Sequence, residues 1–146
     1  MKFLIILFAL TLQLPATKHA NLKNSLAVGG YDVVSYFDRA PEKGNKSIQA
    51  SYEGITYLFS SVSNQQKFRD NPKKYVPAYG GWCAYAMGVS GDKVKIDPET
   101  FKIIDDRLYL FYNFWGNNTL KSWNEDEPAL KTKADKYWSE TLSSNE

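Results

Sequence analysis

The chain has 146 residues, of which 43% are hydrophobic and 15% are aromatic, enough to build the core of one domain. Its 18 basic and 16 acidic residues nearly balance, so charge gives no basis for a nucleic-acid partner or an anionic membrane surface. Cys83 is the single cysteine, which excludes an intramolecular disulfide and leaves one free thiol.

The N-terminus has the pattern of a signal peptide. Lys2 precedes an apolar run, and Pro15 and Ala16 follow it. The run is shorter than the roughly 20 apolar residues that span a bilayer. We therefore expect residues 1–16 to be removed, with cleavage as late as Ala20 as the alternative. The protein is then exported to the periplasm or the extracellular space, with no stable membrane insertion after cleavage.

The first half of the chain predicts one hairpin and two short helical stretches. After a polar lead-in at 17–27, the predicted elements are a short helix or turn at 33–37, a loop at 39–47, a β-hairpin at 51–59, a helix at 61–69 and a second turn at 73–76. Glu53-Gly54 is a turn pair between β-branched and aromatic residues. Ser60 or Ser61 can cap the helix, and Pro72 either ends it or starts the second turn.

The second half predicts another hairpin between helices. Its elements are one or two helical turns at 82–87 ending at Gly88, a hairpin at 101–112, and helices at 113–123 and 127–138. A polar tail, 139–146, closes the chain. Asp105 and Asp106 lie where the second hairpin needs its turn. These elements predict a single α+β domain over residues 28–138, with two β-hairpins packed by short helices.

Cys83 is the sharpest candidate for chemistry. It follows two glycines and is expected to open a helix, where the helix dipole favours a thiolate. Met87 lies four residues later, so the two sulfurs can share a helix face and form a soft pair for a metal such as copper. The alternative is that Cys83 is a small core residue and Met87 fills a gap beside it.

A group of aromatic residues suggests a ligand pocket. Its members are Tyr31, Tyr36, Tyr79, Trp82 and Tyr85. Tyrosine combines an apolar ring with a polar tip, which suits a concave site, and Asp32 can supply a charge that orients a ligand. The alternative is that these rings belong to the core and that Asp32 caps the segment that follows.

Common enzyme sites find little support. His19 is the single histidine, and it lies in the polar lead-in, so a Ser-His-Asp or Cys-His site lacks a base. Asp97, Asp105 and Asp106 are better explained by turns than by a hydrolase pair. With cleavage after Ala16, a Thr17-Lys18-His19 terminus has four nitrogens that can bind Cu(II) or Ni(II).

Several motifs resemble exported YHS-domain proteins. They are Gly30 to Phe37, Tyr52 to Ser61, Phe68 to Tyr75, Tyr79 to Tyr85, Asp97 to Phe101 and Leu108 to Leu110. The resemblance implies a small α+β module related to metal-handling modules, in which cysteines lie before the first hairpin and after its second strand. Here Asp32, Ser60 and Ser61 stand in those regions, and a hydroxyl is a poor ligand for Zn²⁺ or Cu⁺.

The functional prediction is an exported YHS-like domain that binds a small ligand or a soft metal ion, with no catalysis assumed. The ligand site is expected at Tyr31, Asp32, Tyr79, Cys83 and Tyr85, and the metal site at Cys83 and Met87. Two alternatives remain. The first is a thiol-dependent redox protein that uses Cys83, and the second is a protein-interaction module with an aromatic surface.

Overall fold

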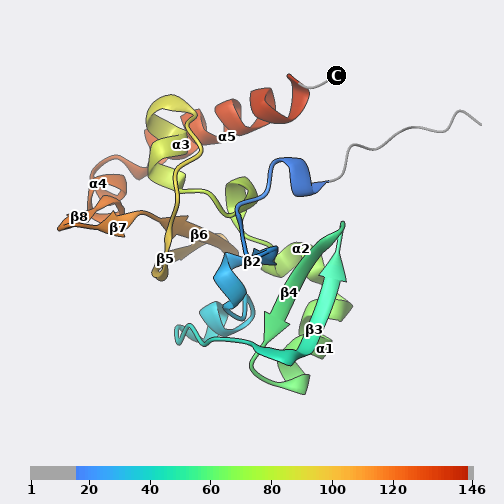
Figure 1. Cartoon of the computed structure of the whole chain (residues 1–146). Helices are drawn as coiled ribbons and strands as arrows, with labels where there is room; N and C mark the ends of the chain where they lie inside the picture. The colour runs from blue at the N-terminus through green and yellow to red at the C-terminus, as the bar shows by residue number, and fades with distance from the viewer. Residues whose placement is uncertain (1–15, 145–146) are drawn as a thin grey trace, which may run out of the picture.

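The first half of the chain forms a four-stranded sheet (Figure 1). In the computed structural model, which describes residues 16–144, the strand order is β1-β2-β4-β3. The strands are β1 (Leu22–Lys23), β2 (Leu26–Ala27), β3 (Asn45–Tyr52) and β4 (Ile55–Phe59). β3 and β4 form an antiparallel hairpin, and β2 lies parallel to β4. Glu53 and Gly54 both have positive φ, as a tight two-residue turn of this kind requires.

Short helices flank this sheet. They are the 3₁₀ helices η1 (Ala16–Lys18), η2 (Val28–Gly30) and η3 (Ser35–Asp38), and the α-helices α1 (Val62–Asp70) and α2 (Pro72–Tyr75). α1 packs on β3 and β4. The Ser61 hydroxyl caps α1 by accepting from the Asn64 N–H at 3.1 Å, which confirms the predicted helix start.

The second half combines helices with two hairpins. Its elements are η4 (Ala78–Gly81), α3 (Ala84–Ser90), β5 (Asp97–Ile104), β6 (Arg107–Phe111), β7 (Asn113–Phe114), β8 (Asn117–Asn118), α4 (Thr119–Glu125) and α5 (Glu127–Ser143). α3 and α5 pack side by side (Figure 1). Gly88 permits this contact, because a Cβ there would lie 2.7 Å from the Leu130 carbonyl oxygen.

Strand β6 joins the two halves of the core. Its side chains alternate, so Leu108 and Leu110 belong to a cluster with the first sheet, whereas Tyr109 and Phe111 belong to a second cluster. The second cluster also contains Met87, Trp123 and other side chains of the helical half. All four β6 residues named here are buried, so one short strand has apolar neighbours on both faces.

The predicted α+β class, with small antiparallel sheets and short helices, is confirmed, but several element boundaries were wrong. The polar lead-in supplies β1 and β2, and the loop expected at 39–47 already belongs to β3 from Asn45 onward. α3 runs past Gly88, because this glycine serves a close helix contact rather than a helix end. α5 likewise continues to Ser143.

The largest error concerns residues 113–118, where the sequence predicted the start of a helix. They form the β7–β8 hairpin instead, and α4 begins only at Thr119, where the Asn118 side chain accepts from the Leu120 N–H. The predicted signal peptide falls almost entirely on residues 1–15, outside the described residues. Within residues 16–144, no helix combines the length and the apolar character that crossing a membrane requires.

Candidate functional site

Asp32 is a fully buried carboxylate at the centre of a hydrogen-bond network. Its Oδ1 accepts from the Val34 N–H at 2.8 Å. Its Oδ2 accepts from the Ser60 N–H at 2.9 Å, the Ser60 hydroxyl at 2.8 Å and the Asn64 amide at 2.7 Å. Both carboxylate oxygens are therefore occupied by protein donors. Through them Asp32 ties the loop before η3 to the end of β4 and the first turn of α1.

The backbone around Asp32 extends this network. The Asp32 N–H donates to the Glu42 carbonyl, and its own carbonyl accepts from the Ser35 hydroxyl at 2.6 Å. Ser35 in turn accepts from the Glu42 N–H at 2.9 Å. Because every polar group of Asp32 has a partner inside the protein, the geometry supports its interpretation as a capping residue over a role in orienting a ligand.

Tyr31 directly precedes Asp32 in the chain, and Tyr36 lies in η3, which follows it. Tyr31 forms a β-bridge with Lys43, and burial, with smaller effects of Glu99 and Asp97, raises the pKa of its hydroxyl. Tyr36 is buried and donates to the Pro98 carbonyl at 2.6 Å; burial is the main cause of the strong upward shift of its pKa. Both hydroxyls therefore stay protonated at neutral pH, and that of Tyr36 acts as a donor.

Cys83 lies in the interior, next to the β7–β8 hairpin. Its side chain is fully buried, and the sulfur accepts from the Tyr112 N–H at 3.3 Å and lies 3.5 Å from the Thr119 hydroxyl. Met87 is also fully buried, in the second core cluster. The thiol is thus a hydrogen-bonding core group closed to solvent, which favours the structural interpretation of Cys83.

The other predicted site residues belong to the second core cluster. Tyr79 is buried and donates to the Asp135 carboxylate at 2.8 Å; burial and this hydrogen bond raise its pKa strongly. Tyr85 is partly buried against the same cluster. The five residues predicted to bind a ligand therefore divide into two groups, with Tyr31 and Asp32 beside the first sheet and the rest among the helices.

A cavity of about 690 Å³ lies elsewhere, between the N-terminal segment, the β3–β4 turn, η4 and the end of α5. Its lining is mainly apolar and comes from segments far apart in sequence; it includes Leu22, Val28, Ile55, Tyr57, Val76, Pro77, Trp138 and Leu142. The lining also includes one acidic side chain, Glu53, and two basic side chains, His19 and Arg107. A mainly apolar hollow with a few polar groups is typical of small-molecule sites.

The N-terminal wall of this cavity is fixed by hydrogen bonds to η4 and the residue after it. The Asn21 N–H donates to the Gly80 carbonyl at 2.8 Å, and the Trp82 indole donates to the His19 carbonyl at 2.7 Å. Gly80 has φ +60° and lies so close to Trp138 that a Cβ would stand 2.9 Å from its ring. The segment predicted as a lead-in is therefore part of the folded domain and of the cavity.

Charge at the cavity comes from Glu53 and Arg107 at neutral pH. Slight burial, followed by the positive charges of Lys93 and Lys18, lowers the pKa of His19, so its imidazole is mainly neutral. The Arg107 side chain is exposed and forms no hydrogen bond or ion pair with any residue between 16 and 144. Its guanidinium is therefore open to a polar group of a bound molecule.

None of the five predicted ligand residues lines this cavity. Sequence reasoning missed it because its wall joins residues from both ends of the described chain. One signal was available: Trp138 and Leu142 are spaced by four residues near the end of α5, which places two large apolar side chains on one face of the helix. Such a pair at the end of a helix needs a cover, and the N-terminal segment supplies part of it.

A comparison with family models places residues 33–79 in the YHS domain family. The chain contains a YHS domain. The matched segment begins directly after Asp32 and ends at Tyr79, so it covers the first hairpin, α1 and α2, whereas the resemblance noted in the sequence reaches to residue 138. Searches of curated proteins and of solved structures gave no match.

The donors present do not fit the thiolate metal site of metal-handling YHS relatives. Asp32 and Ser60 occupy the regions where that site would be. The Ser60 hydroxyl donates a hydrogen bond of 2.8 Å to the Asp32 carboxylate instead. Among residues 16–144, no three or more His, Cys, Asp and Glu side chains are grouped as metal ligands. A hydrogen-bond network therefore connects these two regions of the YHS domain.

Proposed function

We propose that this chain is an exported YHS-domain protein that binds a small, mainly apolar molecule in the cavity beside α5. The observation that carries the proposal is the cavity itself. Its volume of about 690 Å³ falls within the range of roughly 300–1,000 Å³ that is usual for ligand sites. The lining offers an apolar surface for the body of a ligand, and Arg107 and Glu53 offer charges for its polar end.

Export is supported by the N-terminal pattern and agrees with the contacts of residues 17–22. Removal of residues 1–16 leaves His19 and Asn21 in place to close the cavity. Removal of residues 1–20 would take away the carbonyl that accepts from Trp82. We therefore expect the exported protein to begin at Thr17, which the intact mass of the protein from the periplasm or the medium measures directly.

The soft-metal and redox alternatives have less support. A metal at Cys83 and Met87 would have to displace the Tyr112 N–H from the sulfur and would find two soft donors in a closed core. A redox thiol needs access to its oxidant, and the Cys83 side chain has no exposed surface. Ligand binding at the cavity requires neither change.

The test is saturable binding of the uncharged fluorescent probe N-phenyl-1-naphthylamine. Leu142→Asp places a carboxylate in the lining at a side chain that is 50% exposed, so the variant is expected to fold. We expect it to weaken probe binding at least tenfold. Val89→Asp is the matched control, since Val89 is 52% exposed on α3 and outside the lining. Far-UV circular dichroism checks that both variants are folded.

Competition then defines the polar end of the ligand. Dodecanoate, dodecanol and dodecyltrimethylammonium share one apolar chain and differ in charge. Arg107→Gln is expected to weaken the binding of dodecanoate selectively. Glu53→Gln is expected to weaken the binding of dodecyltrimethylammonium selectively. Absence of saturable probe binding, or equal weakening by Leu142→Asp and Val89→Asp, would contradict the proposed cavity function.

A further inference from the structure

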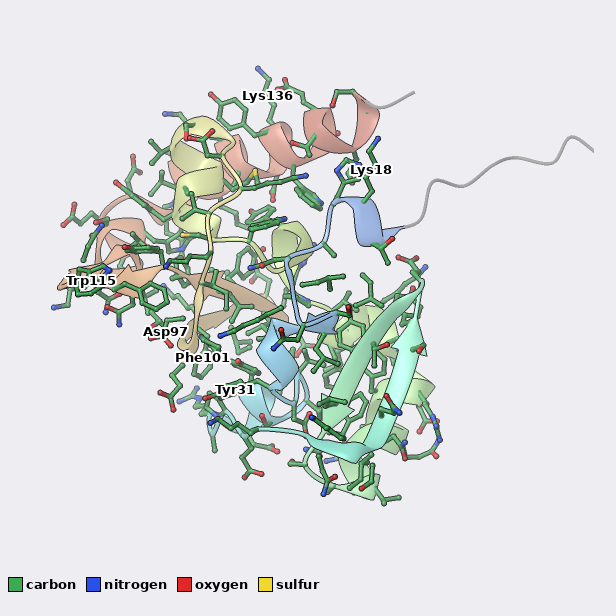
Figure 2. The ribbon with its side chains drawn as sticks, in the orientation of Figure 1. Lys18, Tyr31, Asp97, Phe101, Trp115 and Lys136 are labelled. Atoms are coloured by element: carbon green, nitrogen blue, oxygen red, sulfur yellow. The ribbon has the colours of Figure 1, made fainter. Side chains whose placement is uncertain are left out.

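Trp115 is the most exposed large apolar side chain in the described part of the protein. It is 96% exposed, compared with 68% for Val62 and 52% for Val89. It lies in the turn between β7 and β8. Figure 2 shows Trp115 at the left edge of the molecule and Lys18 on the opposite side. Lys18 directly precedes the cavity residue His19. The cavity proposed above does not use this residue.

The turn holds Trp115 in an unfavourable backbone conformation. Trp115 has φ 56° and Gly116 has φ 77°, so both central residues adopt the left-handed region that a type I′ turn requires. Glycine and asparagine suit this region, whereas a bulky aromatic residue is disfavoured there. No core contact compensates, because the side chain is in solvent. A strained and exposed tryptophan is therefore explained neither by backbone preference nor by core packing.

The hairpin that carries Trp115 is anchored at its base. Tyr112 is fixed from two sides: its N–H donates to the Cys83 sulfur, and its carbonyl accepts from the Thr119 N–H at 3.0 Å and from the Thr119 hydroxyl at 2.8 Å. The Asn113 amide donates to the Thr100 hydroxyl at 3.0 Å. The tip is therefore presented by a rigid base, which lowers the entropy lost on binding.

The neighbours of Trp115 favour a protein partner over an anionic membrane. Phe114 lies under the Lys95 ammonium, 4.7 Å from ring centroid to nitrogen, so this charge is partly used inside the protein. Asp97 opens β5, which packs against β7, and Glu99 is exposed two residues later. Negative charge on the strand that packs against β7 disfavours anionic lipid, whereas a single tryptophan entering a pocket is a common anchor of protein interfaces.

We propose that Trp115 is the anchor of a docking tip, residues 114–117, that inserts into an apolar, indole-sized pocket of a partner protein. The Trp115 Nε1–H has no acceptor among residues 16–144, so the pocket supplies one, a carbonyl or carboxylate oxygen at its base. This interaction is independent of the ligand cavity. It also explains Cys83 as part of the hairpin base rather than as a reactive thiol.

A photo-crosslinking amino acid tests the proposal in cells that naturally make the protein. It replaces Asn117, which is exposed beside the turn, and, as a control, Val62 on α1. We expect one protein to crosslink from position 117 and not from position 62. Crosslinks only to lipid, only to a second copy of this chain, or none at position 117 would overturn the proposal.

Calorimetry with that purified partner then tests the anchor itself. We expect Trp115→Ala to weaken Kd about 30-fold and Trp115→Phe to weaken it less, since phenylalanine keeps the apolar ring but loses the Nε1–H. Val62→Ala should leave Kd unchanged. The unfolding midpoint of Trp115→Ala should equal or exceed that of the wild type, because the side chain has no core contact. A change in Kd below threefold for Trp115→Ala would refute the anchor.

Discussion

Replacing Asp32 with asparagine tests whether the buried network stabilises the YHS domain. The substitution keeps size and shape but removes the charge and turns one acceptor into a donor. If the amide oxygen takes the position of Oδ2, it can still accept from Ser60 and Asn64, but its NH₂ group then faces the Val34 N–H. The opposite orientation is worse, since the NH₂ group would face three donors.

The expected cost follows from the number and kind of bonds. One charge-assisted hydrogen bond is lost, and the three to Oδ2 become bonds to a neutral acceptor; such bonds contribute about 1.5–3 kcal/mol when charged and about 0.5–1.5 kcal/mol when neutral. Relief of the desolvation of a buried charge offsets part of this loss. We expect Asp32→Asn to lower the free energy of unfolding by about 2–4 kcal/mol, a large share of the total for a small domain.

Urea unfolding followed by circular dichroism measures this change. The control is Asp38→Asn, a nearby exposed carboxylate whose substitution should change the free energy of unfolding by less than about 0.5 kcal/mol. Asn64→Ala removes one donor, and in the Asp32→Asn background its effect should shrink, because the two residues share a bond. Equal stability of Asp32→Asn and wild type would refute the reasoning, since desolvation would then outweigh the hydrogen bonds.

Three further predictions concern the helical half. Gly88→Ala should cost about 1–3 kcal/mol in urea unfolding, because its Cβ would lie 2.7 Å from the Leu130 carbonyl oxygen; an equally stable variant would contradict this packing. Cys83 should react with Ellman's reagent only after unfolding, and rapid reaction of the native protein would revive the redox alternative. Burial raises the pKa of Glu127, but hydrogen bonds from Trp123 and Lys102 outweigh it and hold the pKa below its usual range. The carboxylate therefore stabilises the fold above its unfolded pKa, and this stabilisation is lost as the pH falls through the lower folded pKa. Glu127→Gln should lose about 0.5–1 kcal/mol at pH 7 and nothing near pH 2, and a loss independent of pH would contradict the assignment.

The elements that the sequence predicted well have strong local signals. Both predicted hairpin turns contain residues that tolerate positive φ, namely Gly54 in the first and Asp105 and Asp106 in the second. Ser61 caps α1 as predicted, and Pro72 opens α2. Each of these features depends on a few adjacent residues, so the sequence alone contains the necessary information.

The missed elements depend on contacts between distant segments. β1 and β2 have two residues each, too few for an alternating pattern, and β2 exists because it pairs with β4. β7 and β8 also have two residues each, so they show no alternating pattern either. Their turn, Trp115-Gly116, lacks the asparagine that usually marks a type I′ turn.

The candidate site was harder to predict than the fold, for the same physical reason. Residue type alone suggested Asp32 and Cys83, because a charge and a thiol are the usual carriers of chemistry. Whether such a group is available depends on its partners, and the structure gives the Asp32 carboxylate four donors and the Cys83 sulfur one backbone donor in a closed core. The cavity carries no such marker in the sequence, because apolar side chains that line a hollow and those that fill a core look alike.

The Asp32 network gives the YHS domain of this chain a cross-link that needs no metal. In metal-handling relatives, as the resemblance implies, cysteines before the first hairpin and after its second strand can meet at one ion. Here the same two regions meet through Asp32 and Ser60, which are 28 residues apart, and the carboxylate also faces the first turn of α1, where the helix dipole favours negative charge. A carboxylate with no cationic partner in the described part of the chain can be buried there, because peptide and side-chain donors replace its hydration. This network already uses the oxygen atoms that a metal ion would need as ligands. We therefore expect recognition at surfaces outside the network, namely the apolar cavity beside α5 and the exposed tip at Trp115.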